Sequence, residues 1–164
     1  AVTWKGALCN FETVDALCRR VYELSDTYGL AQAMLTQLAS GALAAGHDVI
    51  VCPSPMYPDR MEHLLLPGLS LAFVTGTPAL PYPKRPYRRI RLDAMADQEL
   101  LRRNKARLKF SRKVAAALTE EAVESLAQAK AMHDQLEELY NPHVDFGRVY
   151  RTAQDIIDTL SARL

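Results

Sequence analysis

The residues from Val21 to Leu38 come closest to a pattern that could handle phosphate. Val21–Leu24 has the composition of a short strand, Ser25–Gly29 that of a tight turn, and apolar residues recur at helical spacing from Leu30. Strand, glycine-containing turn and helix form the setting of a phosphate-binding loop, G-x-x-x-x-G-K-[ST]. In that loop the glycines open backbone N–H groups to the phosphates, the lysine neutralises charge, and the hydroxyl binds Mg²⁺. The segment therefore has the outline of a site for phosphoryl chemistry.

The signature residues of that loop are missing. Alignment with the template places Asp26 and Ala31 on the two glycines, Gln32 on the lysine and Ala33 on the serine or threonine. A carboxylate at Asp26 would also repel a phosphate. We expect a degenerate loop over residues 25–33, with no catalytic residue and no metal site. The candidate cofactor-binding residues are Asp26, Thr27, Tyr28, Gly29, Leu30, Ala31, Gln32 and Ala33.

A second candidate is a strongly basic segment. Residues 84–113 hold twelve Lys or Arg against three acids, within a chain of net charge +1. Tyr82 and Tyr87 are interleaved with the first cations, so the segment could contact phosphates or stack a base. A solvated helix face and contact with an acidic partner domain stay open as alternatives. The candidate anion or partner patch is Lys84, Arg85, Arg88, Arg89 and Arg91.

Two histidine arrangements have weaker chemical meaning. His133 and Glu137 are four residues apart on an expected helix and could share a metal, but such a pair is more often a surface contact. His63 and His47 each follow or precede an acid, and neither has a serine or cysteine in a nucleophile-elbow context. We therefore expect no hydrolytic triad.

The elements that must position these residues alternate between strand and helix. After the helix that Gly46 ends, we expect a buried parallel strand at Asp48–Cys52, a short helix at Pro58–Leu64 and a buried strand at Leu69–Val74. A loop at Thr75–Pro86 and a short edge strand at Arg88–Leu92 follow. This order predicts βαβ units and a parallel sheet.

From about Asp93 the pattern becomes helical as far as Tyr140, where Asn141-Pro142 ends it, and a last helix is expected at Phe146–Leu160. We predict an α/β core over residues 1–92, and a long helical extension over residues 93–164 packed on it in the same domain. The 164 residues suit one domain, and no apolar run reaches membrane-spanning length. Three cysteines without CxxC spacing indicate reduced thiols and a cytoplasmic protein.

Taken in order, five segments resemble one repeat of a family of bacterial P-loop ATPases built from two tandem nucleoside-triphosphate-hydrolase-like repeats, and the resemblance points to the C-terminal repeat. The segments are Lys5-Gly6, Arg19–Tyr22, Gly46–Pro53, Glu62–Phe73, and Ala129–Tyr140 followed by Asp145-Phe146. The resemblance implies a P-loop NTPase-like sheet with flanking helices. In intact members it implies ATP and Mg²⁺ bound at a Walker A loop.

The family's binding residues do not carry over to this chain. Only Gly29 matches a glycine often found inside such loops, and Phe73–Gly76 closes the core strand without the acid that normally holds Mg²⁺. Without lysine, hydroxyl and acid, phosphoryl transfer loses its charge neutralisation and its metal. The resemblance thus implies a degenerate domain with a regulatory or assembly role and no cofactor of its own. We expect the sister repeat or further copies of the chain as its partner, and we expect no interaction with a membrane.

Two alternatives stay open. One is a nucleotide-binding ATPase or nucleotide kinase-like domain that uses a non-standard phosphate loop, where helix N-terminal amides hold the anion and Arg88 or Arg89 replaces the lysine. The other is a nucleic-acid-binding module that uses residues 84–113. The chain begins at Ala1 rather than Met, so a processed product and a fragment cut from a larger protein, such as a two-repeat one, both stay open as expectations.

Overall fold

In the computed structural model, which describes residues 1–78 and 80–162, a five-stranded sheet is built around β3 (Arg20–Ser25). The strand order is β4-β5-β6-β3-β7, with β3 parallel to both of its neighbours. The other strands are β4 (Ile50–Pro53), β5 (Met61–Leu66), β6 (Leu71–Gly76) and β7 (Arg88–Arg91). A separate two-stranded hairpin, β1 (Val2–Thr3) with β2 (Gly6–Ala7), opens the chain.

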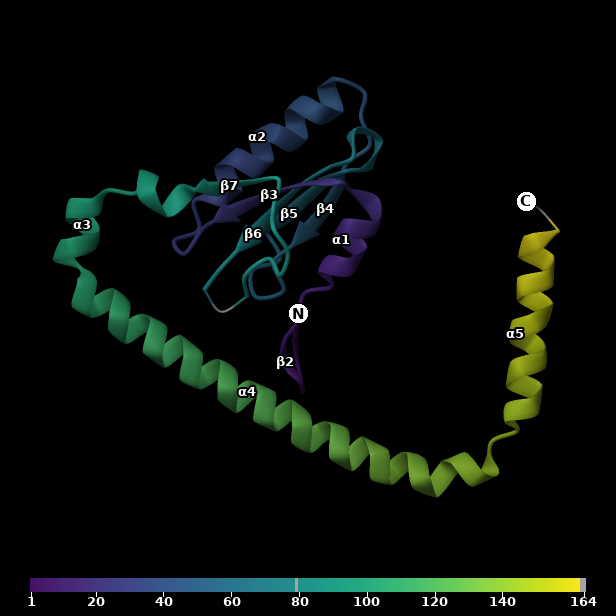
Figure 1. Cartoon of the computed structure of the whole chain (residues 1–164). Helices are drawn as coiled ribbons and strands as arrows, with labels where there is room; N and C mark the ends of the chain where they lie inside the picture. Colours follow the sequence, from purple (N-terminus) through teal and green to yellow (C-terminus); the bar gives the residue numbers. More distant parts are fainter. Residues whose placement is uncertain (79, 163–164) are drawn as a thin grey trace. The chain divides into compact units, whose positions relative to one another are not determined.

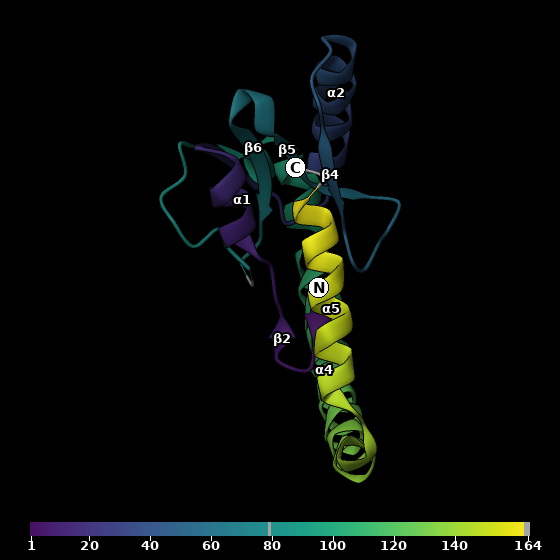
Figure 2. The ribbon, with the colours of Figure 1, turned by 90° about the vertical axis from the view of Figure 1, so that its right-hand side faces the viewer.

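Helices cover both faces of the sheet, as Figures 1 and 2 show. On one face α2 (Ala31–Ala44) packs Leu35 and Ala39 against Leu24 and Phe73. On the other, α1 (Phe11–Leu17) packs against the neighbouring residues of the same strands, which point the opposite way. The residues of this second cluster are Phe11, Val14, Cys18, Val21, Leu65, Ala72, Val74 and Tyr82. The mixed α/β class expected from the sequence is confirmed at this level.

Two expectations for the segment before β6 are wrong. Residues 48–52 were expected as a buried parallel strand, but β4 is an edge strand antiparallel to β5, with Ile50 and Val51 exposed. Residues 58–64 were expected as a helix, but β5 is a strand. Its leucines, Leu64–Leu66, are buried on both faces of the sheet, and this packing overrides a helix-compatible local sequence.

The sheet is consequently mixed, not fully parallel. Only the 3-10 helix Pro67–Leu69 and Ser70 separate β5 from β6. A connection this short cannot make a crossover, so it joins antiparallel strands. The expected strand near Leu69–Val74 and the expected edge strand at Arg88–Leu92 are confirmed as β6 and β7.

The helical extension is confirmed as α3 (Gln98–Arg103), α4 (Lys105–Tyr140) and α5 (Phe146–Ser161), preceded by the 3-10 helix Leu92–Met95. A short 3-10 turn, Asn141–His143, separates α4 from α5. None of the three α-helices has a buried residue among those described. No described helix combines the length and apolarity that crossing a bilayer requires.

The chain divides into two compact units, Ala1–Glu124 and Ser125–Leu164. The first contains the sheet, α1, α2, α3 and the beginning of α4, and the second the end of α4 with α5. The core-and-extension division at residue 92 stays a prediction. Residues 79, 163 and 164, which the sequence assigned to the loop before β7 and to the end of the extension, lie outside the described residues.

Candidate functional site

The loop between β3 and α2 occupies the position at which a phosphate-binding loop would lie. β3 is the central parallel strand, and its carboxyl end delivers the chain directly into residues 26–30 and then into the N-terminus of α2. Ligands of α/β proteins bind at such strand ends, because parallel strands direct their following loops to one edge of the sheet. Gly29 takes a φ of +78°, which glycine tolerates and other residues rarely adopt.

The Asp26 carboxylate fills this loop from inside. It is buried, with 6% of the residue exposed, and it accepts three backbone hydrogen bonds. Oδ1 accepts from Tyr28 N at 3.1 Å and Leu30 N at 2.9 Å, and Oδ2 accepts from Ala31 N at 2.7 Å. These are the kinds of amides that would bind a phosphate in an open loop at a helix N-terminus. The carboxylate therefore stands where an anionic ligand would otherwise be held.

A second carboxylate fastens the same loop from a distant part of the chain. Asp93, just after β7, accepts from Thr27 N through Oδ1 and from the Thr27 hydroxyl through Oδ2, both at 2.7 Å. Sequence reasoning missed Asp93 because 66 residues separate the partners and no motif links them. With both acids in place, four amides of the loop are hydrogen-bonded within the protein.

A depression of about 220 Å³ adjoins the loop at the carboxyl ends of β3 and β6. Its cation is Arg60, from the β4–β5 connection: a Cβ built on Gly29 would lie 3.5 Å from the Arg60 guanidinium. Glu62 also lines it, and burial raises the pKa of this carboxyl, against the smaller opposing effects of the N-terminal charge and a hydrogen bond from Ser54. With two acids, Asp26 and Glu62, and one arginine among its lining residues, the depression lacks the positive charge that a triphosphate needs.

The expected binding residues at the start of α2 are otherwise engaged or apolar. Gln32, in the lysine position, accepts a hydrogen bond from Met61 N at 2.6 Å. Ala31 is buried in the core beneath α2. At the end of β6, the Thr75 hydroxyl donates to the carbonyl of Glu62 at 2.6 Å. The eight loop residues named from the sequence are thus brought together, but around a side chain of the protein itself.

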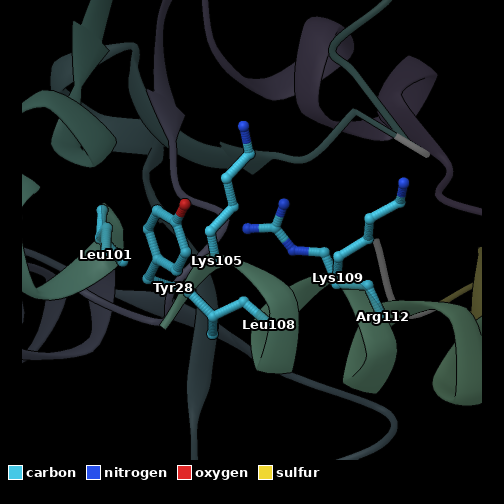
Figure 3. A pocket seen from close by; sticks show the side chains of 6 residues that line it. All are labelled: Tyr28, Leu101, Lys105, Leu108, Lys109 and Arg112. Atoms are coloured by element: carbon cyan, nitrogen blue, oxygen red, sulfur yellow. The ribbon is translucent and has the colours of Figure 1, made fainter. Parts of the chain in front are cut away.

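A second hollow, a groove of about 260 Å³, lies between Tyr28 and the start of the helical extension (Figure 3). The Arg112 guanidinium lies 5.1 Å from the centre of the Tyr28 ring. Leu101 and Leu108 give the groove an apolar floor, and Figure 3 shows Lys105 beside the Tyr28 ring. The lining residues are Tyr28, Leu101, Lys105, Leu108, Lys109 and Arg112.

Two of the five cations in the predicted basic patch form ion pairs within the protein. Arg89 Nε donates to Glu23 Oε2 at 2.7 Å, and Glu23 is only 4% exposed. Lys84 Nζ lies 2.6 Å from Asp15 Oδ2, and Tyr82, whose hydroxyl donates to Asp15, has its pKa raised to about 12 by burial and by that carboxylate. The remaining three patch arginines are on or beside β7, and all three are exposed: Arg85, Arg88 and Arg91.

The histidines show no nucleophilic arrangement among the described residues. His63 Nδ1 accepts from Thr75 N at 3.1 Å, and its Nε2 lies 3.4 Å from Cys9 Sγ. Burial lowers the pKa of His63 to about 4 and raises the pKa of the Cys9 thiol, so this pair is a neutral imidazole and a thiol. His133 and Glu137 form an exposed contact at 3.2 Å on α4, as expected of an i,i+4 pair.

Comparison of the chain with protein-family models, with curated proteins and with solved structures finds no match in any of the three.

Proposed function

We propose that this chain is a degenerate P-loop-type domain that serves a regulatory or assembly role in a bacterial ATPase and hydrolyses no nucleotide itself. The observation that carries the proposal is the Asp26 carboxylate, which accepts hydrogen bonds from Tyr28, Leu30 and Ala31 in the loop. A nucleotide phosphate would have to displace a buried, triply hydrogen-bonded anion of the same charge sign. The loop is thereby fixed in a closed form without a ligand.

The residues near the Asp26 carboxylate also support a domain that hydrolyses no nucleotide. Phosphoryl transfer needs a cation on the β- and γ-phosphates and a metal held by a hydroxyl and an acid. Here Gln32 holds the backbone of β5, Ala33 offers no ligand atom, and Thr75 is hydrogen-bonded to a carbonyl. A domain of this kind contributes its surface to an assembly, while an intact sister repeat would perform the hydrolysis.

Isothermal titration calorimetry of the whole chain with ATP and Mg²⁺ tests the proposal. We expect no saturable heat at 50–100 µM protein and no phosphate release above the blank, since the loop amides are occupied. Saturable micromolar binding, or turnover, would contradict the assignment of a closed loop.

A second candidate, nucleotide binding through a non-standard loop, is favoured by one observation. The guanidinium of Arg60 lies against Gly29, where a cation could meet a phosphate, whereas Arg89 is already paired with Glu23. If the calorimetry does detect ATP, this candidate predicts that Arg60→Ala abolishes binding while Arg88→Ala leaves it unchanged. Nucleic-acid binding by residues 84–113 stays a prediction, which a mobility shift at low salt would test.

A further inference from the structure

One stripe along α4 carries no charged residue. Its members alternate in spacing between three and four residues, which places them on one side of an α-helix and matches the a and d positions of a coiled coil. All are exposed, and the large ones strongly so, with Leu118 at 66%, Met132 at 70% and Leu139 at 72%. The stripe consists of Ser111, Ala115, Leu118, Ala122, Ser125, Ala129, Met132, Leu136 and Leu139.

Charge is distributed unevenly along the same helix. Residues 105–113 of α4 contain five Lys or Arg and no acid, whereas residues 114–140 contain six Asp or Glu and one Lys. Two such helices side by side in the same direction would bring like charges together. In opposite directions, each basic end would meet an acidic end.

From these two observations we propose that a second copy of this chain pairs with α4 in antiparallel orientation through the uncharged stripe. The inference does not depend on the proposed function, since it holds whether or not the loop over residues 25–33 binds a nucleotide. Its occupant is the same sequence, because α4 itself carries both the uncharged stripe and the complementary charge.

Side-chain size favours one alignment of the two antiparallel copies of α4. An antiparallel pair centred between Ala122 and Ser125 aligns each a position with a d position of the second helix. Three of the resulting layers combine a large residue with a small one, as close packing requires. The layers are Ser111 with Leu136, Ala115 with Met132, Leu118 with Ala129, and Ala122 with Ser125. A parallel pair would instead stack alanine on alanine and leucine on leucine, which leaves gaps between bulky layers.

The same register gives the groove of Figure 3 an occupant. Leu139 of the second copy comes level with Leu108, at the apolar floor beside Tyr28. The groove and the stripe are therefore parts of one interface.

Sedimentation equilibrium of the whole chain at 5–100 µM tests for the pair. We expect a dimer of twice the 18.3 kDa chain mass. Ala115→Glu/Ala129→Glu should raise the dimer Kd at least 100-fold, because it buries charges without partners. The matched control, Ala116→Glu/Ala131→Glu, makes the same change at exposed positions off the stripe and should leave the Kd within threefold. A monomer throughout, or equal effects of the two variants, would overturn the proposal.

Cysteine cross-linking tests the orientation. Leu118→Cys mixed with Ala129→Cys should give a mixed disulfide, located by peptide mass spectrometry, while neither variant alone should cross-link through its new cysteine. Cross-linking of each variant by itself would indicate a parallel pair and overturn the antiparallel arrangement. A monomer whose melting temperature falls only in Ala115→Glu/Ala129→Glu would show that another part of the same chain covers the stripe, which also overturns it.

Discussion

Replacement of Asp26 by alanine removes the anion that closes the loop over residues 25–33. The resulting loss of stability can be worked out from the hydrogen bonds that the carboxylate accepts. Three backbone N–H groups lose acceptors at 2.7, 2.9 and 3.1 Å. Hydrogen bonds to a charged group contribute about 1.5–3 kcal/mol each, and water can replace part of them once the side chain is gone. We therefore expect Asp26→Ala to lower the free energy of unfolding by about 3–5 kcal/mol.

Asp97 offers a matched control for this change. It caps α3 by accepting from Glu99 N and Leu100 N, both at 2.9 Å, so it performs the same chemistry in an exposed position. Asp97→Ala should cost about 1 kcal/mol, as an ordinary cap does. Asp26→Asn, which keeps one acceptor oxygen, should fall between the two. Urea denaturation followed by circular dichroism measures all three.

An added anion should replace the lost carboxylate. With Asp26 gone, the amides of Tyr28, Leu30 and Ala31 become available to phosphate at the N-terminus of α2. For a dissociation constant on the order of 5 mM, 50 mM phosphate would stabilise Asp26→Ala by about 1.4 kcal/mol. Phosphate also stabilises folded proteins in general, so the rescue is the excess over the wild type and Asp97→Ala. The reasoning is refuted if Asp26→Ala unfolds within about 0.5 kcal/mol of the wild type, or if phosphate stabilises all the proteins equally.

The other predictions concern two buried polar groups near the sheet. A Cβ at Gly76 would lie 2.6 Å from Glu23 Oε1, so Gly76→Ala should lower the free energy of unfolding by about 1–3 kcal/mol. Gly41→Ala, in open space on α2, should instead raise it by about 0.5–1 kcal/mol in the same urea assay. Burial lowers the pKa of His63 to about 4, from about 6.5 in the unfolded chain. The unfolded chain therefore binds the proton first as the pH drops, and the free energy of unfolding should fall by about 3 kcal/mol between pH 6.5 and pH 4. His63→Gln should remove that part of the slope and the exposed His143→Gln should not; identical slopes in both would contradict the assignment.

Local sequence was sufficient where an element's own residues determine it. The glycine past α2, the Asn141-Pro142 stop after α4 and the periodicity of α5 each depend on neighbours within a few positions, and each was located correctly. β5 could not be identified in this way. Met61–Leu66 is compatible with a helix by propensity and becomes a strand because it is inserted between β4 and β6, a contact that no local pattern encodes.

The site divides along the same line. The missing lysine, hydroxyl and acid of the phosphate-like loop were readable from a template. The sequence also indicates that Asp26 would repel a phosphate. It does not show that the Asp26 carboxylate turns inward and accepts hydrogen bonds from the loop amides. Asp93 and Arg60 reach the loop through the fold alone, from 66 and about 30 residues away in the sequence, and only the structure brings them there.

Nuclear magnetic resonance of the loop amides tests the central claim most directly, since it observes the groups that a nucleotide would have to bind. In ¹⁵N-labelled wild-type chain titrated with ATP and Mg²⁺ to 5 mM, the amide signals of Tyr28, Leu30 and Ala31 should stay in place, because Asp26 already holds them. In Asp26→Ala the same signals should shift on addition of phosphate. Saturable shifts of these amides in the wild type would show that the loop opens to a ligand and would contradict the account.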